Sequence, residues 1–139
     1  MLKIAVIDGQ GGGIGSLIVK RLRAEFKDSI EITALGTNSA ATAGMMKAGA
    51  DKGASGENAI LWNAGRVDVI TGPISIMLPN AMLGELTPLM AEALSSSEAK
   101  KILIPLNQEQ VDIVGFVKEP LPHLVDKLME KIKEIVNHV

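Results

Sequence analysis

The sequence predicts an α/β protein with a three-layer, Rossmann-like open sheet, and three observations lead to this class. Short β-branched and apolar runs alternate with stretches that are apolar every three or four residues, an order typical of a mostly parallel sheet covered by helices. A glycine-rich stretch directly follows the first apolar run and precedes the first helical pattern. The chain has 139 residues and no low-complexity linker or repeat, so residues 1–139 are expected to form one domain.

About five strands are expected in the sheet. Right-handed crossovers predict the spatial order second, first, third, fourth for the first four runs, which are Leu2–Ile7, Ile30–Leu35, Val67–Thr71 and Lys101–Leu106. The run Val111–Val117 follows after only the residues "NQEQ", a spacing that predicts a hairpin. The last strand is therefore expected to be antiparallel, at the edge of the sheet.

The helices are predicted from apolar periodicity and from capping residues. Ser55 is expected to cap a short helix after a turn at Gly49 and Gly53, and Thr87 precedes a proline at the first position of another helix. The helical patterns span Ile14–Phe26, Ser39–Ala48, the residues after Ser55 through Trp62, Pro88–Leu94 and Leu124–Val136.

Composition excludes several classes of function. The net charge is −2 and no stripe of Lys and Arg is present, which argues against nucleic-acid binding. The absence of Cys excludes disulfides and thiolate chemistry, and two histidines are too few for a histidine metal cluster, so no metal is expected. No signal peptide and no apolar run of membrane-spanning length is found, so we expect a cytoplasmic protein without membrane contact.

The stretch "VIDGQGGGIGS" places five glycines within the seven residues from Gly9 to Gly15. Glycine permits positive φ values and lets a ligand approach the backbone, and a helix N-terminus attracts phosphate through unpaired N–H groups. The alternative is a turn that needs glycine only to fold. We expect a phosphate of a nucleotide or dinucleotide to bind this glycine loop, which comprises Asp8, Gly9, Gln10, Gly11, Gly12, Gly13, Ile14, Gly15 and Ser16.

Two further strand ends are expected beside the glycine loop. Gly36, Thr37 and Asn38 follow the second strand, where they are expected either to bind a ribose or second phosphate or to cap the next helix. No Asp or Glu is present there to bind the ribose hydroxyls of NAD and no Arg to bind NADP, so the choice among NAD, NADP and a mononucleotide stays open. Gly72 and Pro73, after the third strand, are expected to form the opposite wall.

Three side chains are candidates for acid–base chemistry, although no catalytic residue is assigned. Asp8 is expected to order the glycine loop through its N–H groups, or else to bind a hydroxyl, an amine or Mg²⁺. Glu85 lies in a predicted lid, Pro79–Pro88; the alternative is a structured loop with Glu85 facing water. His123 is the one realistic imidazole base, with a surface or capping role as its alternative.

The spacing of Gly9, Gly13 and Gly15 resembles the nucleotide loop of short-chain dehydrogenases/reductases, but the chain has no Tyr for that family's Tyr–Lys proton transfer. Over nearly its whole length, the chain is similar to a family of small bacterial proteins known as a domain of unknown function. The resemblance is carried by "KIAVIDGQGGGIG", "ALGTNSAATAGMMKAGA", "GASGENAI", "VDVITGPI", "MLGELTP" and "KKILIPLN". It implies a stand-alone cytoplasmic protein with a Rossmann-like core and supplies no activity.

Three hypotheses of function follow. The first is a protein that binds a small phosphate-bearing molecule as a sensor or regulatory subunit. The second is a small enzyme acting on a nucleotide-like substrate with Asp8, Glu85 or His123. The third is an assembly subunit without a ligand, whose Met- and Ala-rich helices pair with a copy or with a partner, and a homodimer is one expected state.

Overall fold

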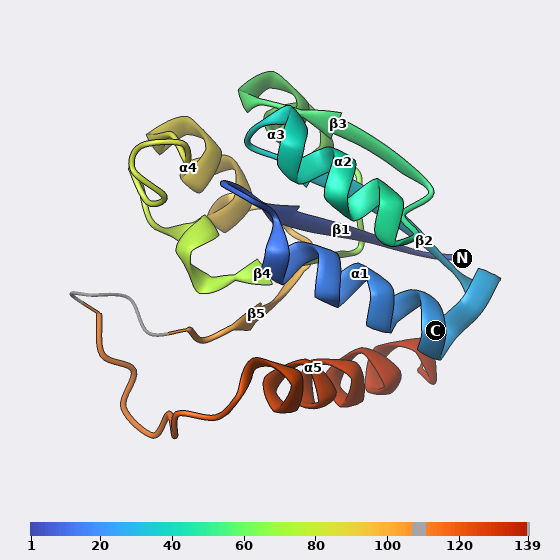
Figure 1. The fold of residues 1–139 in the computed structure, drawn as a ribbon. Coiled ribbons are helices and arrows are strands. Elements are labelled where there is room, and N and C mark those ends of the chain that lie inside the picture. The colour runs from blue at the N-terminus through green and yellow to red at the C-terminus, as the bar shows by residue number, and fades with distance from the viewer. Residues whose placement is uncertain (107–110, 139) are drawn as a thin grey trace.

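A computed structural model describes residues 1–106 and 111–138. Five parallel strands form one sheet in the order β3-β2-β1-β4-β5, and short 3-10 turns follow α1 and β4 (Figure 1). The elements are β1 Leu2–Asp8, α1 Gly13–Phe26, β2 Ile30–Gly36, α2 Ser39–Ala48, β3 Lys52–Ser55, α3 Glu57–Asn63, β4 Val69–Pro73, α4 Pro88–Ser96, β5 Lys100–Ile104 and α5 Leu121–Val136.

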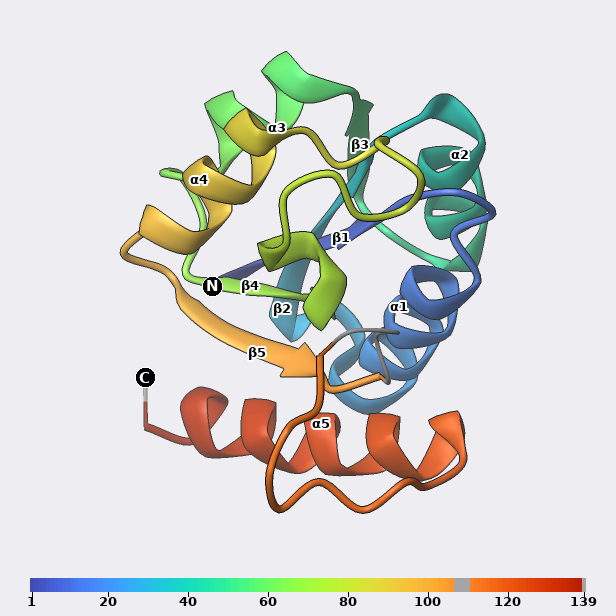
Figure 2. The same cartoon turned by 90° about the vertical axis from the view of Figure 1, so that its left-hand side faces the viewer.

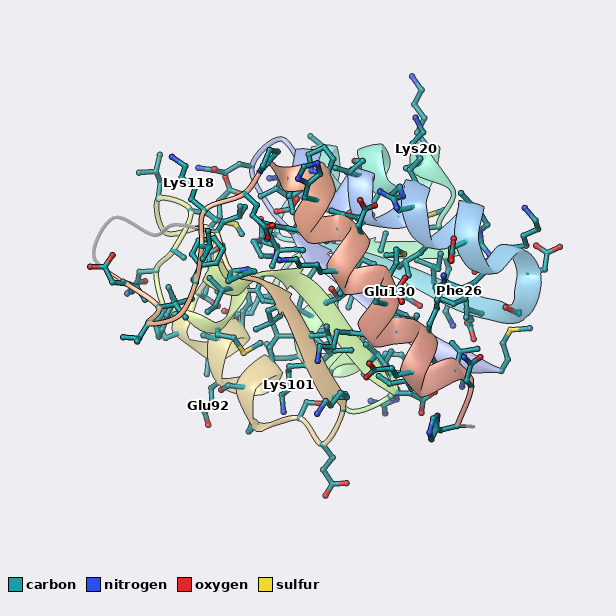
Figure 3. All side chains as sticks on the ribbon, turned by 90° about the horizontal axis from the view of Figure 1, so that it is seen from below. Lys20, Phe26, Glu92, Lys101, Lys118 and Glu130 are labelled. Carbon is teal, nitrogen blue, oxygen red and sulfur yellow. The ribbon has the colours of Figure 1, made fainter. Side chains whose placement is uncertain are left out.

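Helices cover both faces of the sheet and give three layers. One apolar core joins α1, α5 and Met45 of α2 to one face of the sheet, and a second core joins α3 and α4 to the other face. The central strands are buried on both sides, as their continuous apolar runs predict. Figure 3 looks onto α5 and shows Lys20 of α1 pointing away from the sheet. In the described residues, no helix is long and apolar enough to cross a membrane.

The expected spatial order of the first four strands is confirmed, but the antiparallel edge strand is wrong. The sheet is entirely parallel, and Val111–Val117 does not form a strand of it. This segment instead turns at Gly115, whose φ is 87°, and leaves Val114 fully exposed. The linking residues 107–110 lie outside the part of the chain that the structure describes.

The fifth strand is β3, at the opposite edge, where the sequence predicts a turn at Gly53 and a helix cap at Ser55. Both residues belong to β3 instead. The sequence "KGAS" lacks the apolar run of a buried strand because β3 is a short edge strand with mostly exposed residues. The Ser55 hydroxyl donates to Thr42 Oγ1 at 2.7 Å, and the residue before α3 is Gly56, without a side-chain cap.

The strand order creates a crevice beside β1. The chain leaves β1 through α1 toward β2 on one side, while β4 pairs with β1 on the other side. In an open sheet, ligands bind outside the carboxyl ends of the strands at such a reversal. Figure 2 looks onto these strand ends, where the β1–α1 connection and the segment before α4 approach each other.

Candidate functional site

The glycine loop turns sharply between β1 and α1. The Gly12 amide donates to the Gly9 carbonyl at 2.9 Å, and Gly12 adopts a left-handed φ of 71°. A Cβ at Gly12 would lie 2.9 Å from the Ala41 Cα, and one at Gly15 would lie 2.6 Å from the Met45 sulfur. The fold therefore requires glycine at positions 12 and 15, because α1 packs directly against α2.

Gly11 and Gly13 differ from these positions. Neither has a positive φ, and a Cβ on either residue would have no atom within 4 Å. Within the described residues, neither amide N–H donates to an acceptor. Packing and backbone conformation therefore leave these two glycines unexplained.

Asp8 is the last residue of β1, and its side chain holds the glycine loop in place through hydrogen bonds. Its carboxylate is 3% exposed and accepts hydrogen bonds from the Gly9 amide at 2.8 Å and from the Gly15 amide at 2.6 Å. Burial raises the pKa of Asp8 above its ordinary value, and the charge of Glu85 raises it further, while the amide hydrogen bonds oppose the shift. The buried carboxylate of Asp8 thus already accepts a hydrogen bond from one of the backbone N–H groups in the first turn of α1.

Glu85 meets the loop from the other side. Its Oε1 accepts hydrogen bonds from the Gln10 amide at 2.8 Å, from Thr37 Oγ1 at 2.7 Å and from Asn38 Nδ2 at 2.8 Å. These bonds, led by that from Thr37, lower the pKa of Glu85 below its ordinary value. The end of β2 and the glycine loop together hold a carboxylate from a distant part of the chain.

The segment Pro79–Pro88, named here the covering segment, carries Glu85. Its backbone is closed by the Asn80 amide, which donates to the Leu86 carbonyl at 2.7 Å, and the Leu86 side chain is buried. A Cβ at Gly9 would lie 2.5 Å from the Met82 sulfur. The covering segment therefore packs onto the glycine loop; that it moves as a lid stays a prediction.

The β4 side of the loop is open. Gly72 has a φ of 151° and allows β4 to approach the Ile7 carbonyl closely, and Pro73 and the buried Ser75 continue from it. A cavity of about 330 Å³ lies here, and no Lys or Arg of the described chain lines it. Its lining residues are Asp8, Gly9, Gln10, Ile14, Pro73, Ser75, Met82, Leu83 and Leu106.

One buried hydroxyl group near this wall has no partner. Thr71 lies two residues before Pro73 on β4 and is fully buried. Within the described residues, its Oγ1 makes no hydrogen bond. A buried hydroxyl group without a partner normally lowers stability. Packing alone therefore does not explain why β4 carries a threonine at this position.

The structure brings most of the sequence-predicted residues together around β1. Asn38 caps α2 through the Ala41 amide at 2.8 Å while it also contacts Glu85, and Gly36 makes room for Thr42 of α2. Ser16 lies against α2, where its hydroxyl is 3.1 Å from the position of a Cβ on Gly44.

His123 is not part of this constellation. It lies exposed in the first turn of α5 and does not line the cavity beside Asp8. Sequence reasoning missed Ser75 and Leu106, both of which line that cavity. Ser75 directly follows the "TGPI" stretch, which gave a signal for it, whereas nothing local marks Leu106 because the end of β5 brings it to the cavity.

Two other features of the molecule lack the properties of a site. A larger cavity, about 540 Å³, lies along the open edge of β5 against α5 and Phe116. Its charged lining residues are mostly exposed lysines, and no buried polar side chain lines it. Across residues 1–106 and 111–138, no three His, Asp or Glu side chains gather as a metal site would require.

The strand order, the glycine loop at the strand reversal and the cavity beside it define a Rossmann-like α/β protein with a ligand-sized crevice. A family model described as "Domain of unknown function (DUF3842)" matches residues 3–137, so the chain belongs to this family. No curated protein matches the sequence.

Among solved structures, the chain is similar to a dodecameric FMN-dependent UbiX-like decarboxylase from Escherichia coli O157:H7. The two share 14% identity with a TM-score of 0.55, over 96% of this chain and 95% of the other. At this identity the likeness shows the fold alone. It agrees with the Rossmann-like class that the alternating strands and helices predict.

Proposed function

We propose that the protein binds a small phosphate-bearing, nucleotide-like molecule in the crevice at the carboxyl end of β1. The observation that carries this proposal is the contrast within the glycine loop. Gly12 and Gly15 are explained by conformation and packing, whereas Gly11 and Gly13 have open space and, within the described residues, unpaired amides. A ligand oxygen that touches the backbone gives a reason for the missing side chains at both positions.

The charged groups around the glycine loop determine what can offset the charge of a bound phosphate. Gly13 is the first residue of α1, so its amide lies at the positive end of the helix dipole. Asp8 and Glu85 lie close by, and no Lys or Arg of the described chain lines the cavity. The peptide dipoles at the start of α1 must therefore offset the charge of a bound phosphate.

The role that we favour is that of a sensor or regulatory subunit. The described cavity is lined by one carboxyl group, that of Asp8, and by no imidazole, and both oxygens of Asp8 already accept backbone hydrogen bonds. The structural neighbour is named for FMN, a phosphate-bearing cofactor, which is consistent with a phosphate-bearing ligand. Homodimer formation stays a prediction.

The test compares Gly13→Ala with Gly65→Ala in the full-length protein. Neither glycine has a positive φ, and a Cβ on either would have no atom within 4 Å, so both variants are expected to fold like the wild type. Binding of FMN, FAD, NAD⁺, NADP⁺, ADP and pyrophosphate is measured by thermal shift and calorimetry. We expect at least one probe to bind, and Gly13→Ala to weaken it about tenfold, or about 1.4 kcal/mol, while Gly65→Ala does not.

Two outcomes contradict the proposal. If no probe raises the melting temperature of the wild-type protein at millimolar concentration, the phosphate site is rejected. If a probe binds and Gly13→Ala leaves its affinity unchanged, the ligand lies elsewhere.

An enzyme acting through Asp8 is the second candidate. Asp8 lines the cavity and its pKa is raised, while the nearby Glu85 has a lowered pKa, and environments that separate two carboxyl groups in this way are common in acid–base sites. Conversion of a bound ligand by the wild type, lost in Asp8→Asn with binding retained, supports this function. Conversion that survives in Asp8→Asn removes it.

A further inference from the structure

Glu85 supplies a carboxylate at the end of β2, where the local sequence has none. Gly36, Thr37 and Asn38 carry no acidic side chain, yet the Glu85 carboxylate contacts both Thr37 and Asn38. In sheets of this order, the end of the second strand lies beside the ribose of a nucleotide whose phosphates occupy the first loop. The covering segment therefore delivers to this place the group type that β2 lacks.

The two oxygens of this carboxylate have different surroundings. All three hydrogen bonds to Glu85, from Gln10, Thr37 and Asn38, end on Oε1. Throughout the described residues, no donor contacts Oε2. One oxygen is thus fixed in place by the protein, and the other retains its capacity to accept hydrogen bonds.

We propose that Glu85 is a specificity-determining residue whose Oε2 accepts a hydrogen bond from a ribose hydroxyl of the ligand. This inference rests on the proposed function, since it places the sugar of that same ligand beside the glycine loop. It selects a nucleotide with a free vicinal diol. A phosphate ester on the diol is disfavoured because it would bring negative charge against an ionised carboxylate.

The backbone of the covering segment is consistent with this assignment. Asn80, Met82 and Leu83 all adopt left-handed φ values between 56° and 67°, which side chains other than Asn and Asp rarely occupy. Leu83 is 98% exposed, so its packing does not account for the conformation. A strained turn that holds a polar group at a crevice is a recurrent property of binding sites.

The experiment uses Glu85→Gln, which alters the proposed contact with little change elsewhere. The glutamine oxygen can keep the bonds from Gln10, Thr37 and Asn38, while an NH₂ group replaces Oε2. The matched control is Glu92→Gln on the outer side of α4, away from the crevice (Figure 3). Probes are ADP, GDP, CDP and UDP, their 2′-deoxy and 2′-phosphate forms, and pyrophosphate, each titrated by calorimetry.

For the wild type and Glu92→Gln, we expect at least one ribonucleotide to bind about tenfold more tightly than its 2′-deoxy form, the size of effect of one hydrogen bond to a charged acceptor. In Glu85→Gln this preference falls below about twofold and the 2′-phosphate is better tolerated. Pyrophosphate binding is not weakened, because the phosphate site is intact and one negative charge near it is removed.

Each other result identifies what fails. If pyrophosphate and nucleotides bind in a Gly13-dependent manner but ribose and deoxyribose are not distinguished, the role of Glu85 is wrong and the proposed function stands. The same holds if Glu85→Gln keeps the full preference for the ribonucleotide over its 2′-deoxy form. If neither pyrophosphate nor any nucleotide binds the wild type, the proposed function and this inference fail together.

Discussion

The two walls of the crevice, on the β2 side and on the β4 side, differ in how they contact the glycine loop. On the β2 side, the covering segment packs against Gly9, and Glu85 satisfies the donors of Gln10, Thr37 and Asn38. On the β4 side, a cavity of about 330 Å³ separates the loop from Pro73 and Ser75. On the β2 side, within the described residues, the protein satisfies Glu85 Oε1 and leaves Oε2 without a donor, whereas the β4 side holds the cavity.

The site contains two carboxyl groups, and their pKa values shift in opposite directions. Asp8 is almost fully buried, and loss of hydration outweighs its two amide hydrogen bonds. Glu85 keeps contact with water and gains three donors, which favours its ionised form. The difference shows that burial and the number of hydrogen-bond donors, rather than the type of acidic residue, decide the direction in which each pKa shifts.

Gly9→Ala is expected to break the contact at the β2 wall and to have the largest effect on stability. A new Cβ would lie 2.5 Å from both the Met82 sulfur and Thr37 Oγ1, so the covering segment has to shift. Overpacking of this kind lowers the free energy of unfolding by about 2 kcal/mol. Gly11→Ala, which meets no atom within 4 Å, is the control and is expected to stay within about 0.5 kcal/mol of wild type in urea denaturation. Equal stability of the two variants would show that the covering segment does not rest on Gly9.

The opposite pKa shifts predict opposite pH dependences of stability. Asp8 has a raised pKa in the folded protein, so its contribution is present at low pH and is lost as pH rises from about 3.8 through the folded-state pKa. Glu85 has a lowered pKa, so its contribution is present above about 4.5 and is lost as pH falls through the folded-state pKa.

Urea denaturation of wild type, Asp8→Asn and Glu85→Gln between about pH 3 and pH 7 measures both effects. We expect the stability advantage of wild type over Asp8→Asn to shrink with rising pH, and its advantage over Glu85→Gln to grow. Parallel curves for the two variants would contradict the contrast between the walls.

The features predictable from the sequence are those set by neighbours along the chain. The strand Leu2–Asp8, the glycine turn and the helix after it follow from local pattern, because apolar runs, glycine and period fix each in turn. The edge strand β3 was missed because its four residues carry no apolar pattern and depend on pairing with β2. The antiparallel strand was expected where β-prone residues instead form an exposed turn around Gly115.

Within the candidate site, contacts between segments that are distant in the sequence could not be predicted. Glu85 was a candidate through its place in a predicted lid, but its hydrogen bond to Thr37 spans 48 residues. Nothing in the local sequence around either residue specifies the other. The β2 wall is a tertiary arrangement, and only its glycine and Asn38 components have a local signature.

Leu83→Asn tests the strain in the covering segment and is expected to have the smallest effect. Leu83 has a φ of 56° and is 98% exposed, so the substitution removes little packing while asparagine tolerates the left-handed conformation. We expect a gain of about 0.5 kcal/mol in the free energy of unfolding. Leu83→Ala is the control. It removes the same exposed side chain, but alanine tolerates the left-handed conformation no better than leucine, so no gain is expected. A gain of equal size in both variants would mean that exposure of the leucine side chain, and not backbone strain, limits stability at the β2 wall.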